Sequence, residues 1–387
     1  MRTNQLTDDT LRSLAEVEAA EPVVVSLFLD LDPSEFATAP ARASQITSLL
    51  SDLDALLREG ERSRDALESL TADRARLEAF LRDDDLDVAG AGALALYASD
   101  ALDLFAALEL PDPVDASVHV QERPVLEPVM GAQDDGAWCV LLVTRDTARI
   151  LRGGPSGLRE IRGVRSDVKN QHSAGGWSQR RFERSVERDV ESHLEEATGL
   201  LLRQFERRPF DHLVVGANAE SLRPALTGEA HSYLLERVRG WVDIDEQLAS
   251  TAEVLEAVRP VMDEQADAEE RALFERLAAE QGTDGRAAVG LDAVLGALVE
   301  RRVETLLVRE GAEEAGVKCV TCGWMGPRGR TACPVDETAL DEVENIVEPA
   351  IQAAIQQSAG VHVLRRGEEA GSPEAPFDAP VAALLRY

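Results

Sequence analysis

Hydrophobic and polar positions alternate with clear periods in the first third of the chain. The run 22–31, PVVVSLFLDL, is rich in β-branched residues and predicts a buried strand. Apolar residues then recur at helical spacing in 46–57 and again in 66–81, with charged residues between the two stretches. This pattern predicts one long helix or an antiparallel helical hairpin. Further strands are predicted at 93–98 and 102–108.

The middle of the chain opens after the Asp/Gly-rich stretch 131–136, which predicts a linker. Strands are predicted at 138–145, 148–151, 158–162, 212–216 and 241–244, with 219–239 mostly helical. A polar, glycine-containing loop over 163–176 precedes a helix of high regularity. Its apolar stripe consists of Phe182, Val186, Val190, Leu194, Ala197, Leu201 and Phe205. Strands that alternate with helices predict a mixed α/β sheet.

The last third continues the same alternation. Helices are predicted at 263–280, 291–300 and from 336 to about 357, and strands at 304–308, 360–364 and, in the apolar closing stretch, 381–385. A cysteine-containing segment lies between the first of these strands and the last helix. The expected domains are an α/β domain over 1–130, a central domain over 131–259 and a C-terminal domain over 260–387.

Length and composition fit this division. A chain of 387 residues is too long for one core. With 44% hydrophobic and 29% charged residues, it has the composition of a soluble globular protein. No uninterrupted apolar run approaches the roughly 18 residues of a membrane span, and the amino terminus is polar. We therefore expect a cytoplasmic protein with no membrane contact.

Charge is strongly uneven along the chain. The net charge is −32, and Lys169 and Lys318 are the only lysines, so the surface as a whole repels polyanions. Residues 145–190, however, carry 11 Arg/Lys and 6 Asp/Glu, a net of +5. Because screening at physiological salt acts over about 8 Å, distant acids scarcely weaken a local cationic patch. The sequence therefore allows one site that attracts nucleic acid.

The segment around the start of the regular helix combines flexibility with positive charge. Gly175 and Gly176 permit backbone conformations that a Cβ would forbid, and Ser178 is predicted to cap the helix. Cations repeat every four residues, about 200° from the apolar stripe: Arg180, Arg184 and Arg188. Taken alone, this is equally the pattern of a glycine turn before an amphipathic helix with solvated arginines.

The string 173–184, SAGGWSQRRFER, resembles the catalytic loop of the archaeal and eukaryotic class I peptide chain release factors. In that family Gly-Gly-Gln-Ser is followed by an Arg-Phe pair and another arginine. The matching residues are Gly175, Gly176, Ser178, Arg181, Phe182 and Arg184. Trp177 stands at the glutamine position, and Gln179 follows two residues later. Related peptidyl-tRNA hydrolases of the Vms/Ankzf type place their glutamine a little beyond the glycine pair, which favours Gln179 as the substitute.

The resemblance extends over roughly residues 137–387. Residues 304–311 are similar to the start of the family's third domain, Cys319 and Cys322 to its small zinc ribbon, and 377–387 to its carboxyl terminus. It implies an α/β, three-domain release-factor-like architecture with mixed sheets and a zinc-ribbon-like insertion in the third domain. The family's Asn-Ile-Lys-Ser signature is absent from the sequence, so codon reading is expected to be lost.

The resemblance implies a codon-independent peptidyl-tRNA hydrolase that acts in the ribosomal peptidyl-transferase centre and frees nascent chains from stalled ribosomes. Gly175, Gly176 and Gln179 would place backbone and amide groups beside the ester. The residues expected to contact RNA are His172, Trp177, Arg180, Arg181, Arg184 and Arg188. The implied partners are large-subunit rRNA and peptidyl-tRNA, with a monomer off the ribosome.

Trp177 supports an alternative function. An indole is large and only a donor; it would stack on an exposed base or block the place of the attacking water. In the second case the chain is a catalytically inactive ribosome-binding or hibernation factor that occupies the A site. Trp177 packed beneath its own helix remains the structural alternative.

The cysteines form one cluster and one outlier. Cys319-x-x-Cys322 is followed by Cys333 after ten residues, which is zinc-ribbon spacing. The resemblance puts Asp336 where the family has its fourth cysteine, and three thiolates with one carboxylate would hold a structural Zn²⁺. Three reduced thiols without metal are the alternative, and no catalytic cofactor is expected. Cys139, in an apolar run, is predicted to be a core residue.

Overall fold

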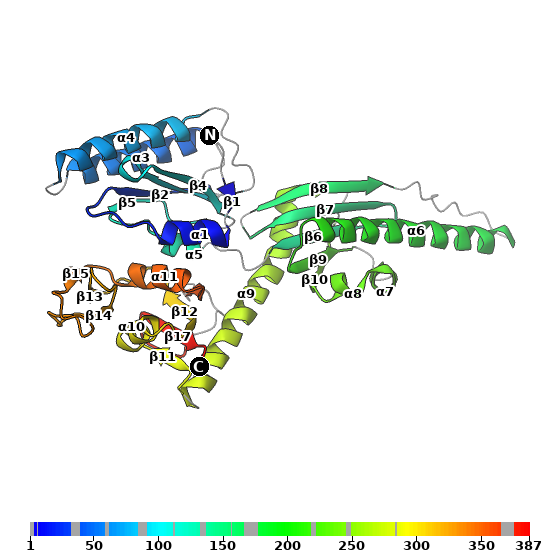
Figure 1. Ribbon diagram of the computed structural model, residues 1–387. Coiled ribbons are helices and arrows are strands. Elements are labelled where there is room, and N and C mark those ends of the chain that lie inside the picture. Colours follow the sequence, from blue (N-terminus) through cyan, green and yellow to red (C-terminus); the bar gives the residue numbers. More distant parts are fainter. Residues whose placement is uncertain are drawn as a thin grey trace. The chain divides into compact units, whose positions relative to one another are not determined.

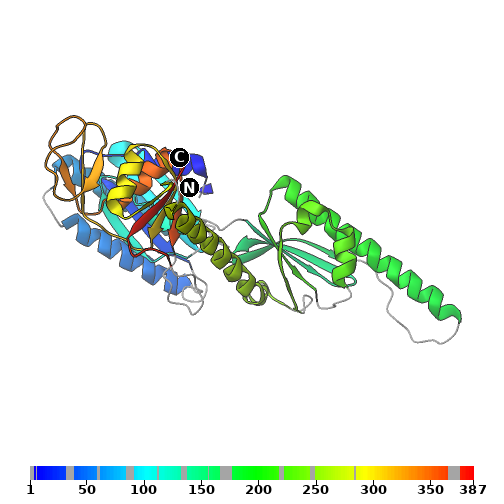
Figure 2. The same cartoon turned by 90° about the horizontal axis from the view of Figure 1, so that it is seen from below.

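The computed structural model describes residues 4–5, 7–31, 39–58, 62–83, 91–110, 113–131, 137–155, 157–165, 177–217, 222–244, 249–282, 285–364 and 375–387. The chain divides into two compact units (Figures 1 and 2). The first combines Met1–Gln133 with Asp267–Tyr387, and the second is Asp134–Ala266. Among the described residues, no helix has the length and apolar character needed to cross a membrane.

The N-terminal part of the first unit contains a five-stranded sheet of order β1-β4-β3-β2-β5. Its strands are β1 (Asn4–Gln5), β2 (Val24–Asp30), β3 (Ala93–Ser99), β4 (Leu104–Leu110) and β5 (Ser117–Gln121). β1 pairs with β4 in parallel, and the other pairs are antiparallel. Side chains alternate across β2: Leu27 packs into one core cluster and Phe28 into another on the opposite face.

Helices cover both faces of this sheet. They are α1 (Asp8–Ala15), α3 (Ala39–Arg58), α4 (Arg64–Leu81), the 3₁₀ turn η1 (Asp100–Leu102) and α5 (Glu127–Gly131). α3 and α4 are separate helices that bury Leu53 and Leu70 against the side of β2 that holds Leu27. Arg74 of α4 donates to Asp54 of α3 at 2.6 Å. The periodicity therefore corresponds to the helical hairpin and not to one long helix.

The C-terminal part of the first unit holds a four-stranded and a three-stranded sheet. The larger has the order β11 (Ala287–Val289), β17 (Val381–Leu385), β12 (Val303–Arg309), β16 (Gly360–Leu364), and the smaller β14 (Met325–Pro327), β13 (Gly316–Lys318), β15 (Asp341–Val343). The helices are α10 (Leu291–Val299), α11 (Val347–Gln356) and the second half of α9 (Thr251–Gly282). β12 is parallel to β16 and antiparallel to β17.

The two parts of the first unit share a hydrophobic core. One cluster contains Phe28 and Leu126 from the N-terminal part and Leu295 and Ile351 from the C-terminal part. Polar contacts cross the same junction, because Gln352 of α11 donates to the Pro124 carbonyl at 2.9 Å. The expected division into three domains remains our proposal; the first and third of them belong to one compact unit.

The second unit is a five-stranded mixed sheet. Its order is β10 (Val238–Val242), β9 (His212–Gly216), β6 (Trp138–Val143), β7 (Thr147–Gly154), β8 (Gly157–Arg165). Its helices are α6 (Trp177–Arg207), α7 (Leu222–Glu229), α8 (Ser232–Leu235) and the first half of α9. α6 packs on the face of the sheet that carries Leu141 and Ile150, and α9 packs on the opposite face through Val254 and Val258.

The predicted helix from 336 to about 357 is wrong in its first half. α11 begins only at Val347, and Asp341–Val343 forms β15, which pairs with β13. Asp336 instead lies in a turn where its carboxylate accepts from the Thr338 amide at 3.1 Å. Local side-chain capture of backbone groups competes with helix formation. The stretch 219–239 likewise splits into α7 and α8 before β10 begins.

Candidate functional site

The glycine-containing loop predicted to carry the chemistry connects β8 to α6. His172, Gly175 and Gly176 lie outside the described residues, between the end of β8 at Arg165 and the start of α6 at Trp177. Their expected roles therefore stay predictions. The described structure begins again with the backbone of α6.

The helix starts earlier than the sequence predicts. Ser178 was expected to cap it, but Trp177 is already helical, so Ser178 and Gln179 belong to its first turn. The first four backbone N–H groups of an α-helix have no partner within it. They carry a partial positive charge that attracts anions. The backbone thus puts Gln179 in the first turn of α6, where the amides have no partner within the helix, shortly after the glycine pair.

The later turns of α6 anchor it to the sheet. Among the residues whose side chains are described, the half-buried Val190 packs into the core, as do Leu194, Ala197 and Leu201, which are at most 1% exposed. Thr198 adds a bond from its hydroxyl to the Leu194 carbonyl at 2.9 Å. Figures 1 and 2 show the helix continuing past the strands toward its N-terminal end. The turns from Val190 to Leu201, called the stem below, are therefore buried against the sheet, and the helical backbone of 177–188 lies on their N-terminal side.

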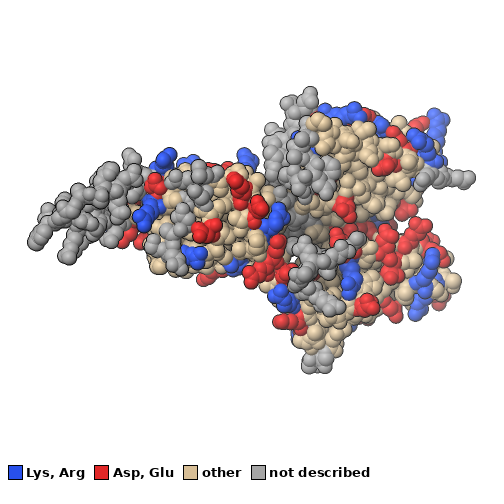
Figure 3. All heavy atoms as spheres, turned by 180° about the vertical axis from the view of Figure 1, so that it is seen from behind, with Lys and Arg blue, Asp and Glu red and all other residues tan. Residues whose placement is uncertain are grey.

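The sign of the net charge along α6 changes near residue 188, where the stem begins. Residues 177–188 contain four arginines and two glutamates, whereas 189–202 contain four acids and no Lys or Arg. Arg188 is exposed. Arg180, Arg184 and Arg188 follow one another at four-residue spacing along the helical backbone and so share a face. Trp177 and Arg181 also belong to this basic end. Figure 3 shows acidic and basic side chains mixed over one face of each unit.

Three further exposed arginines lie outside the predicted set, on β8: Arg159, Arg162 and Arg165. The positive count over 145–190 includes them. The sequence alone does not say which way they point, because that depends on strand register.

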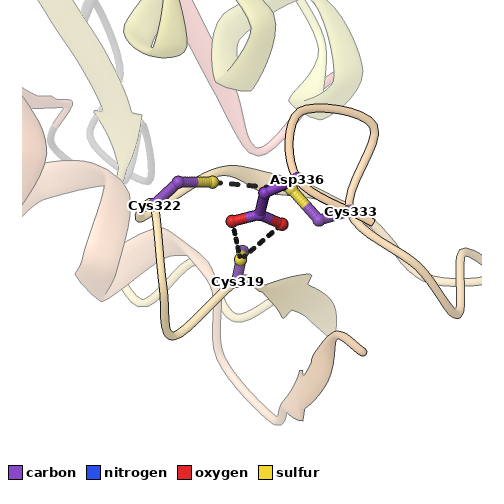
Figure 4. A group of neighbouring side chains, drawn as sticks. All are labelled: Cys319, Cys322, Cys333 and Asp336. Carbon is purple, nitrogen blue, oxygen red and sulfur yellow. Dashed lines mark hydrogen bonds between the residues drawn. The ribbon is translucent and has the colours of Figure 1, made fainter. Parts of the chain in front are cut away.

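The four predicted metal ligands converge in the first unit. Figure 4 shows Cys319, Cys322, Cys333 and Asp336 pointing toward one another, and their ligand atoms all lie within 4.8 Å of each other. The Sγ atoms of Cys322 and Cys333 are 3.5 Å apart, and Cys319 Sγ lies 3.5 and 3.6 Å from the two Asp336 oxygens. A tetrahedron with Zn–S of about 2.3 Å and Zn–O of about 2.1 Å has edges of roughly 3.5–3.8 Å. The donor set therefore fits a closed four-coordinate metal site.

Backbone geometry and electrostatics prepare these groups as ligands. Gly323, which follows the first cysteine pair, has φ +73°, and its amide donates to the Cys319 carbonyl at 2.9 Å. The Thr338 amide holds the pKa of Asp336 down to about 2, so the carboxylate is charged at neutral pH. Backbone hydrogen bonds from Cys322 and Thr321 lower the pKa of Cys319. The shifts of Asp336 and Cys319 favour the deprotonated form that binds a metal. Burial and the neighbouring thiols and carboxylate instead raise the pKa of Cys322 to about 12.

Cys139 has the opposite character. It is fully buried in β6, and burial raises the pKa of its thiol to about 12. A thiol of this kind is neither a ligand nor a nucleophile. The prediction of a core residue is confirmed.

Comparison with known proteins places the second unit in a described family. Residues 128–263 match the model of bacterial archaeo-eukaryotic release factor family 10. This stretch nearly coincides with the compact unit Asp134–Ala266. Similarity to the archaeal protein "Peptide chain release factor subunit 1" reaches further. The Thermococcus sibiricus protein is 25% identical over 72% of this chain and 73% of its own length, and the Methanocaldococcus jannaschii protein has the same three values.

Solved structures of related proteins are more distant. The archaeal translation termination factor aRF1 aligns over 99% of both chains at 15% identity with a TM-score of 0.27. Pelota from Archaeoglobus fulgidus aligns over 76% of this chain and 79% of its own at 17% identity with a TM-score of 0.33. The family match of the central unit and the similarity of most of the chain to archaeal release factors support an archaeo-eukaryotic release-factor-like family.

Proposed function

We propose that this translation factor is a codon-independent peptidyl-tRNA hydrolase that acts in the ribosomal peptidyl-transferase centre and releases nascent chains from stalled ribosomes. The observation that carries the proposal is the basic N-terminal end of α6. Its helical backbone follows the Gly175–Gly176 pair in the sequence and continues past the strands, and the described buried stem runs from Val190 to Leu201. A narrow, positively charged projection of this kind suits entry between RNA phosphates.

Hydrolysis of this ester depends more on the position of the attacking water and of hydrogen-bond donors than on a strong acid or base. Hydrolysis of the ester between peptide and tRNA ribose needs an ordered water and donors for the developing oxyanion. Gly175 and Gly176 give the backbone room to approach the ester. Gln179 offers a side-chain amide that orients water without acting as a nucleophile, and the free amides of the first helical turn surround it. One preorganised donor contributes about 10²–10³ in rate.

RNA binding is assigned to the residues around that tip. Arginine suits this role because its planar guanidinium holds a phosphate with two parallel hydrogen bonds. The proposed phosphate contacts are His172, Arg180, Arg181, Arg184 and Arg188, with Trp177 stacking on a base. Base–aromatic stacking contributes about 1–3 kcal/mol. The partners are large-subunit rRNA and peptidyl-tRNA, and off the ribosome the protein is proposed to be a monomer.

The direct test is release of labelled peptide from peptidyl-tRNA on stalled ribosomes. Gln179→Ala is expected to lower the release rate about 100-fold or more, as loss of a placed donor does, while ribosome binding stays intact. Gln204→Ala, near the other end of α6, is the matched control and is expected to release peptide at the unchanged rate. Equal rates for the two variants would remove the proposed chemistry.

Trp177 favours one alternative, a factor that occupies the A site of idle ribosomes without hydrolysis. In that case the indole fills the place of the attacking water. The unmodified protein would co-sediment with idle ribosomes and release no peptide. Trp177→Gln, which restores the release-factor residue at that position, would then create release activity. For a hydrolase that uses Gln179, the same substitution instead leaves activity dependent on Gln179.

The cysteine cluster is proposed to hold a structural Zn²⁺ through Cys319, Cys322, Cys333 and Asp336. When bound, the ion would cross-link the two turns that carry these residues. The donor set supplies all four positions of a closed tetrahedron. The role is therefore assigned to folding of the β13–β15 segment, and no catalytic cofactor is proposed.

A further inference from the structure

The β7–β8 hairpin is a strongly basic part of the second unit. Residues 145–165 contain six arginines and two acids, a net of +4 in a chain of −32. Both acids are engaged within the hairpin region. Glu160 pairs with Arg149 at 2.8 Å, and Asp146 accepts from the Thr144 hydroxyl at 2.9 Å. The hairpin therefore keeps a net positive charge after both acids are counted.

A β-bulge turns two of these arginines to the same side of the sheet. In a regular strand, residues three apart point to opposite faces. On β8, however, Arg159 pairs with Arg152 and Arg162 pairs with Ile150, so Ile161 is an extra residue. Ile150 and Arg152 are two apart on β7, so both pairs share the face on which α6 packs. Arg159 and Arg162 are thus neighbours about 7 Å apart along the strand.

The two side chains are exposed at the edge of the sheet. β8 is the terminal strand in the sheet order, and neither Arg159 nor Arg162 has a hydrogen bond or ion pair with another described residue. Arg152 on the same face behaves differently, since its guanidinium donates to the Arg208 and Pro209 carbonyls at the end of α6. Arg152 therefore has a structural role. No comparable contact with a described residue explains the side chains of Arg159 and Arg162.

We propose that Arg159 and Arg162 form a second RNA-binding strip that holds phosphates of a ribosomal RNA strand beside the one proposed to contact α6. The inference rests on the proposed function for the identity of its partner. β8 leads directly into segment 166–176 and α6 follows it, so both basic surfaces flank the same loop.

RNA is the partner that fits the chemistry of this strip. Guanidinium groups in a row along an exposed strand match the repeated charge of a phosphate backbone. Charged side chains also protect edge strands from pairing with other chains. That role, however, does not require two arginines on one face, which here depends on the extra residue Ile161.

The test compares binding to protein-free large-subunit rRNA between about 50 and 200 mM salt. The R159E/R162E variant is expected to bind more weakly, with a slope of log affinity against log salt that is smaller by about 0.7–0.9 for each phosphate that the variant no longer neutralises. R203E/R207E, which makes the same charge change at two exposed α6 positions, is the control and keeps the slope. R159Q/R162Q, checked for an unchanged Tm, is expected to reduce the slope in the same way without charge reversal.

Two results overturn the inference. One is an rRNA affinity and salt slope for R159E/R162E equal to those of R203E/R207E. The other is weaker binding to intact ribosomes with unchanged binding to protein-free rRNA, which would make the partner a protein. The proposed hydrolase activity is tested by a separate measurement, the release of peptide by the Gln179→Ala variant. A negative result there does not change the outcome of the rRNA-binding test.

Discussion

At the scale of single residues, Asp336 is the proposed fourth ligand that would complete a metal site with the three cysteines. The sequence predicts all four ligands, and the structure brings them together. Their convergence could be predicted because the four residues are close in sequence and are placed by short turns, whereas their role as metal ligands stays a prediction. The β8 arginines were missed because their direction depends on a bulge, which the sequence does not reveal.

A metal-binding prediction follows for this cluster. Asp336→Ala is expected to lower Zn²⁺ affinity by more than about 10-fold, since a ligand contributes at least as much as the outer groups that orient ligands. Asp336→Cys is expected to raise it, because thiolate is the stronger partner for zinc. Competition with a chromophoric chelator measures both. The control is Asp341→Ala, at an exposed site outside the cluster, and an affinity for Asp336→Ala equal to that of this control would exclude the carboxylate as a ligand.

Glu348 makes a pH-dependent contribution to stability. It is 6% exposed on α11 and accepts from the Leu126 and Glu127 amides at 2.7 and 3.3 Å, yet burial raises its pKa to about 7. The folded state therefore holds a proton that the unfolded chain releases above about pH 4.5. This contribution is present at low pH and is lost as the pH rises toward and through about 7.

The expected result is a free energy of unfolding that falls between pH 5 and pH 8 by an amount that depends on Glu348. Glu348→Gln should reduce that fall by on the order of 2–3 kcal/mol. Urea unfolding at the two pH values measures it, with the exposed Glu344→Gln as the matched control. An unchanged difference in Glu348→Gln would show that the carboxyl does not titrate in this range.

At the scale of elements, periodicity predicted the helices that bury a continuous stripe. The stripe of α6 is confirmed from Val190 through Phe205. The side chains of Phe182 and Val186 lie outside the described part of the helix. The helix predicted to start at Asp336 is wrong in its first half, because these residues form turns and a strand that pairs with β13. Short strands such as β13 and β14, of three residues each, carry too few positions for a period to be recognised.

The anchoring of α6 gives a stability prediction. Leu194 is 0% exposed in the core beneath the helix, so Leu194→Ala is expected to cost about 2–5 kcal/mol through reduced burial and the cavity left behind. Arg188→Ala, six residues earlier and exposed, should change stability by less than about 0.5 kcal/mol. Urea unfolding followed by circular dichroism compares them. Equal effects would mean that the stem does not hold α6 on the sheet.

At the scale of the whole molecule, the sequence predicted an α/β protein but not its compact units. Residues of the shared core, such as Phe28 and Ile351, are far apart in the chain, and no local period connects them. The second unit, Asp134–Ala266, is contiguous in sequence, so its alternating strands and helices can be followed along the chain. Net charge also misleads at this scale, because −32 hides a basic segment over 145–190.

The central claim is that the basic end of α6 brings the glycine-containing tip to the ribosome. The most direct test is co-sedimentation of the full chain with ribosomes after reversal of Arg180, Arg184 and Arg188 to glutamate, with R203E/R207E as the control on the same helix. The account predicts that the triple variant loses association while the control keeps it, and that wild-type binding weakens steeply as salt rises. Ribosome binding by the triple variant at the level of the control would contradict it.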